Sequence, residues 1–296
     1  MAVAEADMAK PDAHFLPRSW RLAHGRELEV GTRGHLKAIV NVTPDSFSDG
    51  GRFDTGEAAV EAALEMVREG ASIVDIGGES TRPGAEPIDA AMEQARVLPV
   101  IEQLAARSDA ILSIDTYRAE TARLAVEAGA HIINDVWGLQ KDDGMAAAAA
   151  ELGAGLCIMH TGRGRRKADD VIEDQFLFLG KSLEIARAAG VAEAAIALDP
   201  GFGFAKDADE NIELMARFGE LHALGFPLVA GTSRKRFIGA LSGREMDARD
   251  VATAATTAML RLQGAAVFRV HDIAANRDAL AMADAVLAGP HTGAQP

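Results

Sequence analysis

The chain has 296 residues, of which 48% are hydrophobic and 25% charged, and its formal net charge at pH 7 is −14. This is the composition of a globular protein with enough chain to bury a substantial core. The acidic balance argues against nonspecific binding to nucleic acid, which needs a basic face, and the single cysteine, Cys157, excludes an intramolecular disulfide.

The first elements in chain order are an N-terminal segment and a hairpin. Residues 1–18 lack the basic and apolar regions of a signal peptide, and we expect them to be flexible. The stretch "RSWRLAHGRELEVGTRG" has two short alternating runs around a glycine turn, which predicts a hairpin covering the bottom of the fold. No apolar run approaches the roughly 20 residues that span a bilayer. We therefore expect a cytoplasmic protein with no membrane partner.

Short apolar runs rich in Val and Ile then recur and predict buried parallel strands. They lie at residues 37–41, 72–77, 110–115, 131–135, 155–160, 195–199, 227–231 and 266–270. Amphipathic stretches separate most of these runs, as helices separate the strands of an α/β fold. The pattern predicts an α/β protein with one (β/α)₈ TIM barrel over residues 19–288, followed by a flexible tail at 289–296. An open, doubly wound sheet is the alternative.

Polar residues gather where the predicted strands end, which is the end of a TIM barrel that carries the active site. These residues are Asn41, Asp75, Asp115, Asn134, Asp135, His160, Asp199, Ser233, Arg234, Lys235, Arg269 and His271. Any one of them could be structural, and a lone histidine such as His160 is more often a hydrogen-bonding group than a ligand. As a set they indicate a functional site, because ionisable groups are seldom buried without partners.

The residue types at these ends favour one ligand class over others. Ser80 and Ser233 lack the surroundings of an acyl-transfer nucleophile, and metal-ligand spacing of the HxxxH type is absent from the sequence. Asp115 and Asp199 could serve a glycosidase, but with 5% aromatic residues the chain has few platforms for a sugar. Carboxylates, an amide and a lysine suit a planar heterocycle that presents N–H donors beside a carbonyl, and arginines suit a phosphate.

Seven motifs resemble the dihydropteroate synthase family, in the family's order and over nearly the whole chain. They are "NVTPDSFSDGG" (41–51), "DIGGESTRPGA" (75–85), "SIDT" (113–116), "INDV" (133–136), "LDPGFGF" (198–204), "GTSRK" (231–235) and "RVHD" (269–272). The resemblance implies a TIM barrel. It also implies condensation of 6-hydroxymethyl-7,8-dihydropterin pyrophosphate with p-aminobenzoate, giving 7,8-dihydropteroate and pyrophosphate on the route to folate.

The resemblance also implies a role for individual residues of this chain. The pterin would be held by Asp115, Asn134, Asp199 and Lys235, the β-phosphate by Arg269 and His271, and the aminobenzoate ring by Phe47, Pro83 and Phe204. Thr81 and Arg82, with Pro83, would belong to a mobile loop over both substrates. Asp49 and Lys235 would be catalytic, and Asn41 would help to bind Mg²⁺ with the pyrophosphate. The implied reaction breaks the C–O bond first, so it needs an anion clamp and a slot poor in water.

The chain departs from the family pattern at three places. Ala38 stands where the family usually has glycine, which we expect to matter little. Arg236 stands where the family usually has a serine that contacts the carboxylate of p-aminobenzoate. The stretch 161–170, "TGRGRRKADD", is unusually basic, and we interpret it as a solvated surface loop.

Two other functions share parts of this pattern. A pterin-binding methyl-transfer module uses an intact folate on the same barrel, but the loops at 43–51 and 80–84 favour the synthase. A catalytically silent homologue would keep the pterin residues and lose these loops. The family implies a homodimer, for which the alanine-rich stretch "VATAATTAMLRL" is a candidate interface, although packing of this stretch against its own barrel is the other interpretation.

Overall fold

The computed structural model describes residues 12–43, 55–80 and 86–289. Its strands are β1 (Arg18–Arg21), β2 (Glu27–Val30), β3 (His35–Asn41), β4 (Ile73–Gly77), β5 (Ile111–Asp115), β6 (Ile132–Asp135), β7 (Gly155–Met159), β8 (Ile196–Asp199), β9 (Val229–Ala230) and β10 (Val267–Val270). Its α-helices are α1 (Thr55–Glu69), α2 (Ala90–Arg107), α3 (Ala119–Glu127), α4 (Met145–Leu152), α5 (Val171–Ala188), α6 (Ala208–Ala216), α7 (Arg236–Ser242), α8 (Asp250–Leu262) and α9 (Ile273–Ala288). Short 3₁₀ turns are η1 (Ala13–Phe15), η2 (Ala23–Gly25), η3 (Glu193–Ala195), η4 (Phe218–Leu224) and η5 (Met246–Ala248).

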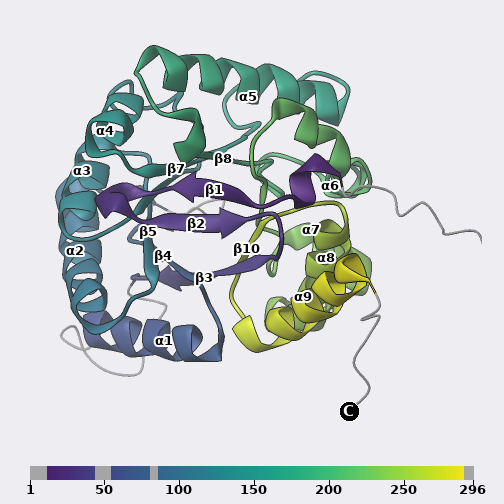
Figure 1. Cartoon of the computed structure of the whole chain (residues 1–296), viewed down its shortest axis with the longest axis horizontal. Coiled ribbons are helices and arrows are strands. Elements are labelled where there is room, and N and C mark those ends of the chain that lie inside the picture. Colours follow the sequence, from purple (N-terminus) through teal and green to yellow (C-terminus); the bar gives the residue numbers. More distant parts are fainter. Residues whose placement is uncertain (1–11, 44–54, 81–85, 290–296) are drawn as a thin grey trace, which may run out of the picture.

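The long strands form one eight-stranded parallel sheet in the order β8-β7-β6-β5-β4-β3-β10-β9, and the helices surround it (Figure 1). A parallel bridge between Leu198 and Leu228 joins the two edges of this sheet, so the barrel is nearly closed. The predicted (β/α)₈ barrel is therefore confirmed, and the open doubly wound sheet is excluded.

Side chains alternate between the two faces of each strand, which divides the apolar core in two. The larger part lies between the sheet and its helices and includes Val74 and Ile114. The smaller part fills the interior of the barrel near the strand starts and includes Ile73 and Cys157. On five strands the position two residues further along the same inner face is polar, namely Asp75, Ser113, Asn134, Asp199 and Arg269, so the barrel interior changes from apolar to largely polar toward the strand ends.

The predicted N-terminal hairpin is present as the antiparallel pair β1–β2, and it crosses one end of the barrel (Figure 1). Trp20 is buried among the lower interior residues, and its indole Nε1 donates to the carbonyl oxygen of Ala195 at 2.8 Å. The hairpin therefore closes the strand-start end, and ligands have to reach the interior from the opposite end.

The expected flexible termini lie mainly outside the described residues, at 1–11 and 290–296. Of the remainder of the first segment, residues 13–15 form η1 and Arg18 begins β1. Among the helices of the described chain, none has the length and apolar character required to cross a membrane.

Candidate functional site

Charged and polar side chains line the inner face of the barrel toward the strand ends. They come from six strands and one loop and are Lys37, Asp75, Asp115, Asn134, Asp199, Lys235 and Arg269. Parallel strands of a barrel bring their carboxyl ends to one rim, which is why residues far apart in sequence meet here. Five of them were predicted site residues, namely Asp115, Asn134, Asp199, Lys235 and Arg269.

Arg269 joins two of the carboxylates. Its Nε donates to Asp75 Oδ2 at 2.6 Å, and its Nη2 donates to Asp115 Oδ2 at 2.7 Å. Burial alone would raise the pKa of Asp75, but the charges of Lys37 and Arg269 lower it below its usual value. Burial raises the pKa of Asp115 despite the charge of Arg269. Asp75 is thus the firmly ionised member of the pair.

Asp199 and Lys235 meet over a glycine. Asp199 Oδ1 accepts a hydrogen bond from the Gly201 backbone N–H at 2.7 Å. A Cβ added at Gly231 would lie 3.7 Å from Asp199 Oδ2 and 3.9 Å from Lys235 Nζ. The missing side chain therefore leaves open the space on which these two polar atoms converge. This is the arrangement that a ligand with an N–H donor beside a carbonyl requires.

Lys235 is held by the loop that follows β8. Its Nζ donates to the carbonyl oxygen of Phe202 and lies 4.6 Å from the centre of the Phe204 ring. Gly203 has a φ of 76°, and a Cβ at that position would lie 2.9 Å from the Lys235 side chain. Only glycine satisfies both constraints without strain. Burial lowers the pKa of Lys235 to about 7, although the charge of Asp199 opposes the change.

The predicted phosphate residue His271 and the strand-end residue Arg234 lie in different surroundings. His271 lies at the end of β10, where its Nδ1 is 2.9 Å from Ser233 Oγ, and its backbone N–H donates to the same oxygen at 3.1 Å. When the Ser233 hydroxyl donates to Nδ1, the neutral ring carries its proton on Nε2. Arg234, by contrast, makes a two-pronged ion pair with Asp250, at 2.8 Å for both contacts. Its guanidinium therefore anchors the start of α8.

Asn41, the predicted metal residue, lies at the end of β3 beside Gly77 of β4. A Cβ added at Gly77 would lie 3.7 Å from Asn41 Oδ1 and 3.8 Å from Asp115 Oδ2. Two oxygens thus face the open space above one glycine. In the part of the chain that the structure describes, His, Cys, Asp and Glu nowhere form a group of three or more that could hold a metal ion.

Asp135 shows that a strand-end carboxylate can be structural. Its two oxygens accept from the backbone N–H groups of Trp137 and Leu139, at 2.8 and 2.7 Å. These bonds shape the turn after β6. Burial raises the pKa of Asp135 to about 6, and the two backbone hydrogen bonds oppose this rise.

Five predicted site residues lie outside the described residues. They are Phe47 and Asp49, within 44–54, and Thr81, Arg82 and Pro83, within 81–85. The strands that precede these two segments, β3 and β4, are adjacent in the sheet. The described ends of these two strands, Asn41 and Gly77, lie side by side at the carboxyl end of the barrel.

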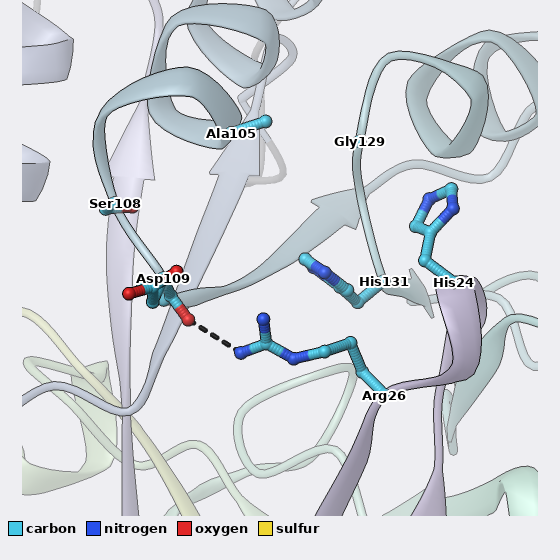
Figure 2. Close-up of a pocket in the computed structure, with 8 residues that line it drawn as sticks. His24, Arg26, Ala105, Ser108, Asp109, Gly129 and His131 are labelled. Carbon is cyan, nitrogen blue, oxygen red and sulfur yellow. Dashed lines mark hydrogen bonds between the residues drawn. The ribbon is translucent and has the colours of Figure 1, made fainter.

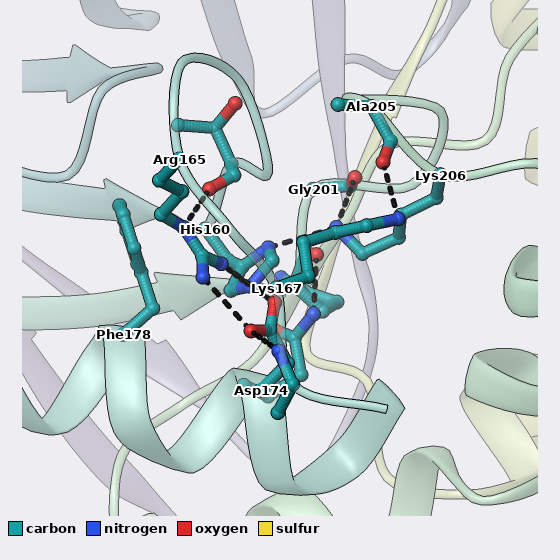
Figure 3. A network of polar contacts seen from close by, with 12 residues as sticks. His160, Arg165, Lys167, Asp174, Phe178, Gly201, Ala205 and Lys206 are labelled. Carbon is teal, nitrogen blue, oxygen red and sulfur yellow. Dashed lines mark hydrogen bonds and ion pairs between the residues drawn. The ribbon is translucent and has the colours of Figure 1, made fainter. Parts of the chain in front are cut away.

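The basic stretch 161–170 is not a solvated surface loop, which corrects the expectation from the sequence (Figure 3). Arg165 donates to both carboxylate oxygens of Asp174 on α5, at 2.8 and 2.6 Å. Lys167 donates to the carbonyl oxygen of Ala205 at 2.8 Å. Arg165 and Lys167 thus pair with a carboxylate and a carbonyl of neighbouring segments, and Arg166 is the basic residue of this loop that remains exposed.

His160 joins this loop to the one after β8 (Figure 3). Its Nε2 lies 2.9 Å from Asp174 Oδ2, and Lys206 Nζ lies 2.8 Å from its Nδ1 and 3.0 Å from the carbonyl oxygen of Gly201. Burial lowers the pKa of His160 to about 4 and that of Lys206 to about 7. A neutral ring therefore accepts from Lys206 and donates to Asp174, which supports a structural role for His160.

A separate hollow lies at the opposite end of the barrel, near the starts of β5 and β6 (Figure 2). His24, Arg26 and His131 line it, and Arg26 donates to the carbonyl oxygen of Asp109 at 2.7 Å. This hollow shares no residue with the charged rim.

Sequence reasoning missed Lys37 and Lys206. Lys37 was placed at the first position of its strand, whereas β3 begins at His35 and Lys37 is inside it. The alternation of side chains along a strand was the available signal, because it places Lys37, Ile39 and Asn41 on one face. Lys206 follows a glycine-rich loop in which local pattern predicts no burial.

The chain is similar to proteins of one family along most of its length. Residues 37–271 match the family described as "Pterin binding enzyme". The dihydropteroate synthase of Bacillus subtilis is 44% identical over 260 residues, covering 87% of this chain and 91% of the relative. The structure of Xanthomonas albilineans dihydropteroate synthase with 4-aminobenzoic acid has a TM-score of 0.87 and 44% identity, covering 92% of this chain and 100% of that one. The same enzyme in complex with 7,8-dihydropteroate has a TM-score of 0.83 and 42% identity, covering 91% and 100%.

Proposed function

Since the chain belongs to the dihydropteroate synthase family, we propose how its own residues hold the two substrates of that enzyme. The reaction condenses 6-hydroxymethyl-7,8-dihydropterin pyrophosphate with p-aminobenzoate, and it yields 7,8-dihydropteroate and pyrophosphate for folate biosynthesis. Relatives that are 41 and 44% identical over 88 and 87% of this chain favour the synthase over the methyl-transfer alternative.

The pterin lies against the inner rim of the barrel in this proposal. Asp199 accepts from the pterin's N–H donors, and Lys235 donates to its ring carbonyl, so the ring enters the space that Gly231 leaves open. Asp115 and the amide of Asn134 meet the other edge of the ring. The observation that carries this assignment is the convergence of Asp199 Oδ2 and Lys235 Nζ, at 3.7 and 3.9 Å from one point over Gly231.

The second substrate lies beside Phe204, with Phe47 and Pro83 flanking it from segments outside the described residues. Phe204 is partly exposed, and its ring contacts the Lys235 ammonium and, at 4.7 Å, the guanidinium of Arg163. The attacking aniline nitrogen is neutral at pH 7, so no strong general base is required of Asp49 or Lys235.

The leaving pyrophosphate is stabilised by positive charge at the same rim. Arg269 and His271 lie two residues apart on the inner face of β10 and its extension, and Thr81 and Arg82 belong to the segment that follows β4. As the C–O bond breaks, charge develops on the departing oxygen, and fixed donors there lower the barrier. Among the described residues, Arg269 and His271 supply these donors.

Mg²⁺ fits the space beside Asn41, where Asn41 Oδ1 and Asp115 Oδ2 face the open position over Gly77. Arg269 already occupies Asp115 Oδ2 at 2.7 Å, so the protein offers few oxygens. That donor set suits an ion that binds mainly through pyrophosphate and water. When bound, Mg²⁺ would neutralise part of the charge on the leaving group.

Replacing Asn41 by alanine should raise the Mg²⁺ concentration that gives half-maximal activity, by about fivefold, because one of few protein oxygens is lost. Activity measured across a Mg²⁺ titration checks this, and the melting temperature of the variant should stay close to that of the parent protein. Full activity of the parent enzyme in excess chelator would contradict the metal assignment.

Replacing Arg236 by serine should raise the KM for p-aminobenzoate by about tenfold or less, with pterin affinity unchanged. Arg236 begins α7 directly after Lys235, and its side chain is exposed, so it can add a charged contact to the carboxylate of p-aminobenzoate. Steady-state kinetics with each substrate varied in turn measures the effect. An unchanged KM would place Arg236 on the free surface, and a loss of pterin affinity would show that Lys235 and Arg236 share one pocket.

The test of the whole assignment is release of pyrophosphate from the pterin substrate, measured with and without p-aminobenzoate. A synthase releases pyrophosphate rapidly only when p-aminobenzoate is present and forms one 7,8-dihydropteroate for each pyrophosphate. Binding of the pterin without turnover would instead indicate a catalytically silent homologue.

The enzyme forms a homodimer through α8 and α9 in this proposal. Both helices pack on the barrel, yet each also exposes apolar side chains on its outer face. These are Val251, Met259 and Leu262 on α8 and Met282 and Val286 on α9. The inner face of α8 packs on its own barrel, and the apolar outer face supports the proposal that α8 also forms the interface. Sedimentation equilibrium should give twice the mass of the chain, and a monomer at all concentrations would exclude this interface.

A further inference from the structure

Lys37 is a lysine buried inside the barrel, with a side chain that is 1% exposed. It rises from the middle of β3 toward the charged rim, and its ammonium lies 2.9 Å from Asp75 Oδ1 and 2.8 Å from Asn134 Oδ1. Burying an ammonium group costs several kcal/mol unless partners surround it. A cation in this position therefore needs a reason beyond packing, because an apolar side chain would fill the same space at lower cost.

The contacts of Lys37 determine how the Asn134 amide is oriented. An ammonium group has only donors, so it must face the amide oxygen, Oδ1. The amide nitrogen, Nδ2, then faces Asp115, whose Oδ1 accepts from it at 3.2 Å. Lys37 and Asp115 thus hold the two ends of one amide. The contacts continue from Asp115 to Arg269 and from Arg269 to Asp75, which pairs with Lys37 and so closes a ring of polar contacts.

We propose that Lys37 is a positioning residue for pterin recognition. It fixes the Asn134 amide from the strand-start side, and the pterin meets Asn134 and Asp115 from the side of the strand ends. This inference rests on the proposed placement of the pterin against Asn134 and Asp115. Lys37 does not touch the substrate. It acts through Asn134. Its positive charge also keeps Asp75 ionised, so that Arg269 remains shared between Asp75 and Asp115.

The electrostatics of the rim agree with this role. The charge of Lys37 lowers the pKa values of Asp75, Asp115 and Asp199 against burial, which raises each of them. The other groups facing this cluster from the surrounding elements are Asn134 on β6, Cys157 on β7, Lys235 after β9 and Arg269 on β10. Loss of Lys37 therefore raises the pKa of Asp199, and the acid limb of pterin binding should move to higher pH.

The test is Lys37→Met, which keeps the length of the side chain and removes its donors and charge. The probe is 6-hydroxymethyl-7,8-dihydropterin pyrophosphate with Mg²⁺, titrated calorimetrically without p-aminobenzoate. We expect its Kd to rise about tenfold or more, because Asn134 Oδ1 loses its buried donor, while the KM for p-aminobenzoate changes less than about twofold. An unchanged Kd at every pH between 5 and 8 overturns the proposal.

A matched control separates positioning from a general loss of stability. Arg261 is likewise a buried cation, 1% exposed, and it pairs with Asp284 and donates to the Gly31 carbonyl oxygen, without contact to the rim. Arg261→Met should lower the melting temperature and leave the pterin Kd unchanged. Equal losses of pterin affinity in both variants would show that the effect of Lys37→Met is only structural.

A double-mutant cycle with Asn134→Ala tests the route of the effect. If Lys37 acts through Asn134, the double variant binds pterin about as weakly as Asn134→Ala alone, and additive losses overturn the proposal. If Asn134→Ala itself leaves pterin binding intact, the placement of the pterin fails instead.

Should Lys37→Met not fold, Lys37→Gln retains an amide donor for Asn134 without the charge. Its Kd should then lie between that of the parent protein and that of Asn134→Ala, and a parent-like Kd and pH profile overturn the proposal.

Discussion

Replacing Asp199 by asparagine should weaken binding of the pterin substrate by about a hundredfold or more. Asp199 Oδ1 accepts from the Gly201 N–H at 2.7 Å, and an asparagine keeps that bond by placing its own oxygen there. The new NH₂ group then occupies the position of Oδ2, over Gly231. In the proposed placement, the pterin presents its own N–H donors to this position. A donor facing a donor in a buried site loses the hydrogen bond and leaves both groups unsatisfied, at a cost of roughly 3 kcal/mol.

Calorimetric titration with the pterin pyrophosphate measures this change, and Asp135→Asn is its matched control. Asp135 is also a buried aspartate at a strand end, but both of its oxygens accept from backbone N–H groups. Its substitution should reduce the free energy of unfolding and leave the pterin Kd intact. An Asp199→Asn protein that binds pterin as well as the parent would remove Asp199 from the site.

The barrel could be predicted from the sequence because its strands carry a strong local signal. Each expected apolar run coincides with an observed strand to within about two residues at either end. The seventh barrel strand is shortened most in proportion, since only Val229 and Ala230 form β9 where residues 227–231 were expected. Strand ends depend on which neighbours complete the hydrogen-bond ladder, and the pattern of one segment does not contain that information.

The site was predictable in part, for a topological reason. Asp115, Asn134, Asp199 and Arg269 follow from the rule that parallel strands direct their carboxyl ends to one rim. Contacts between a loop and the helix that follows it do not result from that rule. The two-pronged pair of Arg165 with Asp174 depends on how α5 lies against the loop before it, so the basic stretch looked solvated in sequence.

The last prediction concerns Lys235, for which Lys235→Met should reduce kcat/KM for the pterin substrate by about a hundredfold or more. The variant loses the cation that faces the pterin carbonyl in the proposed placement, and it loses the charge that balances Asp199. Burial lowers the pKa of Lys235 to about 7, so the parent enzyme should lose kcat/KM as the pH rises above 7 and the ammonium deprotonates. Lys235→Arg keeps its charge at every pH, and its profile should lack this alkaline limb even though its rate is lower.

Lys206 also has a pKa lowered to about 7 by burial, so the two lysines have to be distinguished. Both have folded-state pKa values below the roughly 10.4 of an unfolded lysine. The unfolded chain therefore binds more protons between these limits, and the stability of the parent protein should rise as the pH increases above 7. Lys235→Met and Lys206→Met should each remove part of that rise in a series of thermal denaturations.

Only the Lys235 substitutions should remove the alkaline limb of kcat/KM, because Lys206 contacts His160 and Gly201 rather than the open space over Gly231. An alkaline limb that persists in Lys235→Arg and disappears in Lys206→Met would assign the titration to the buried network and leave Lys235 charged throughout.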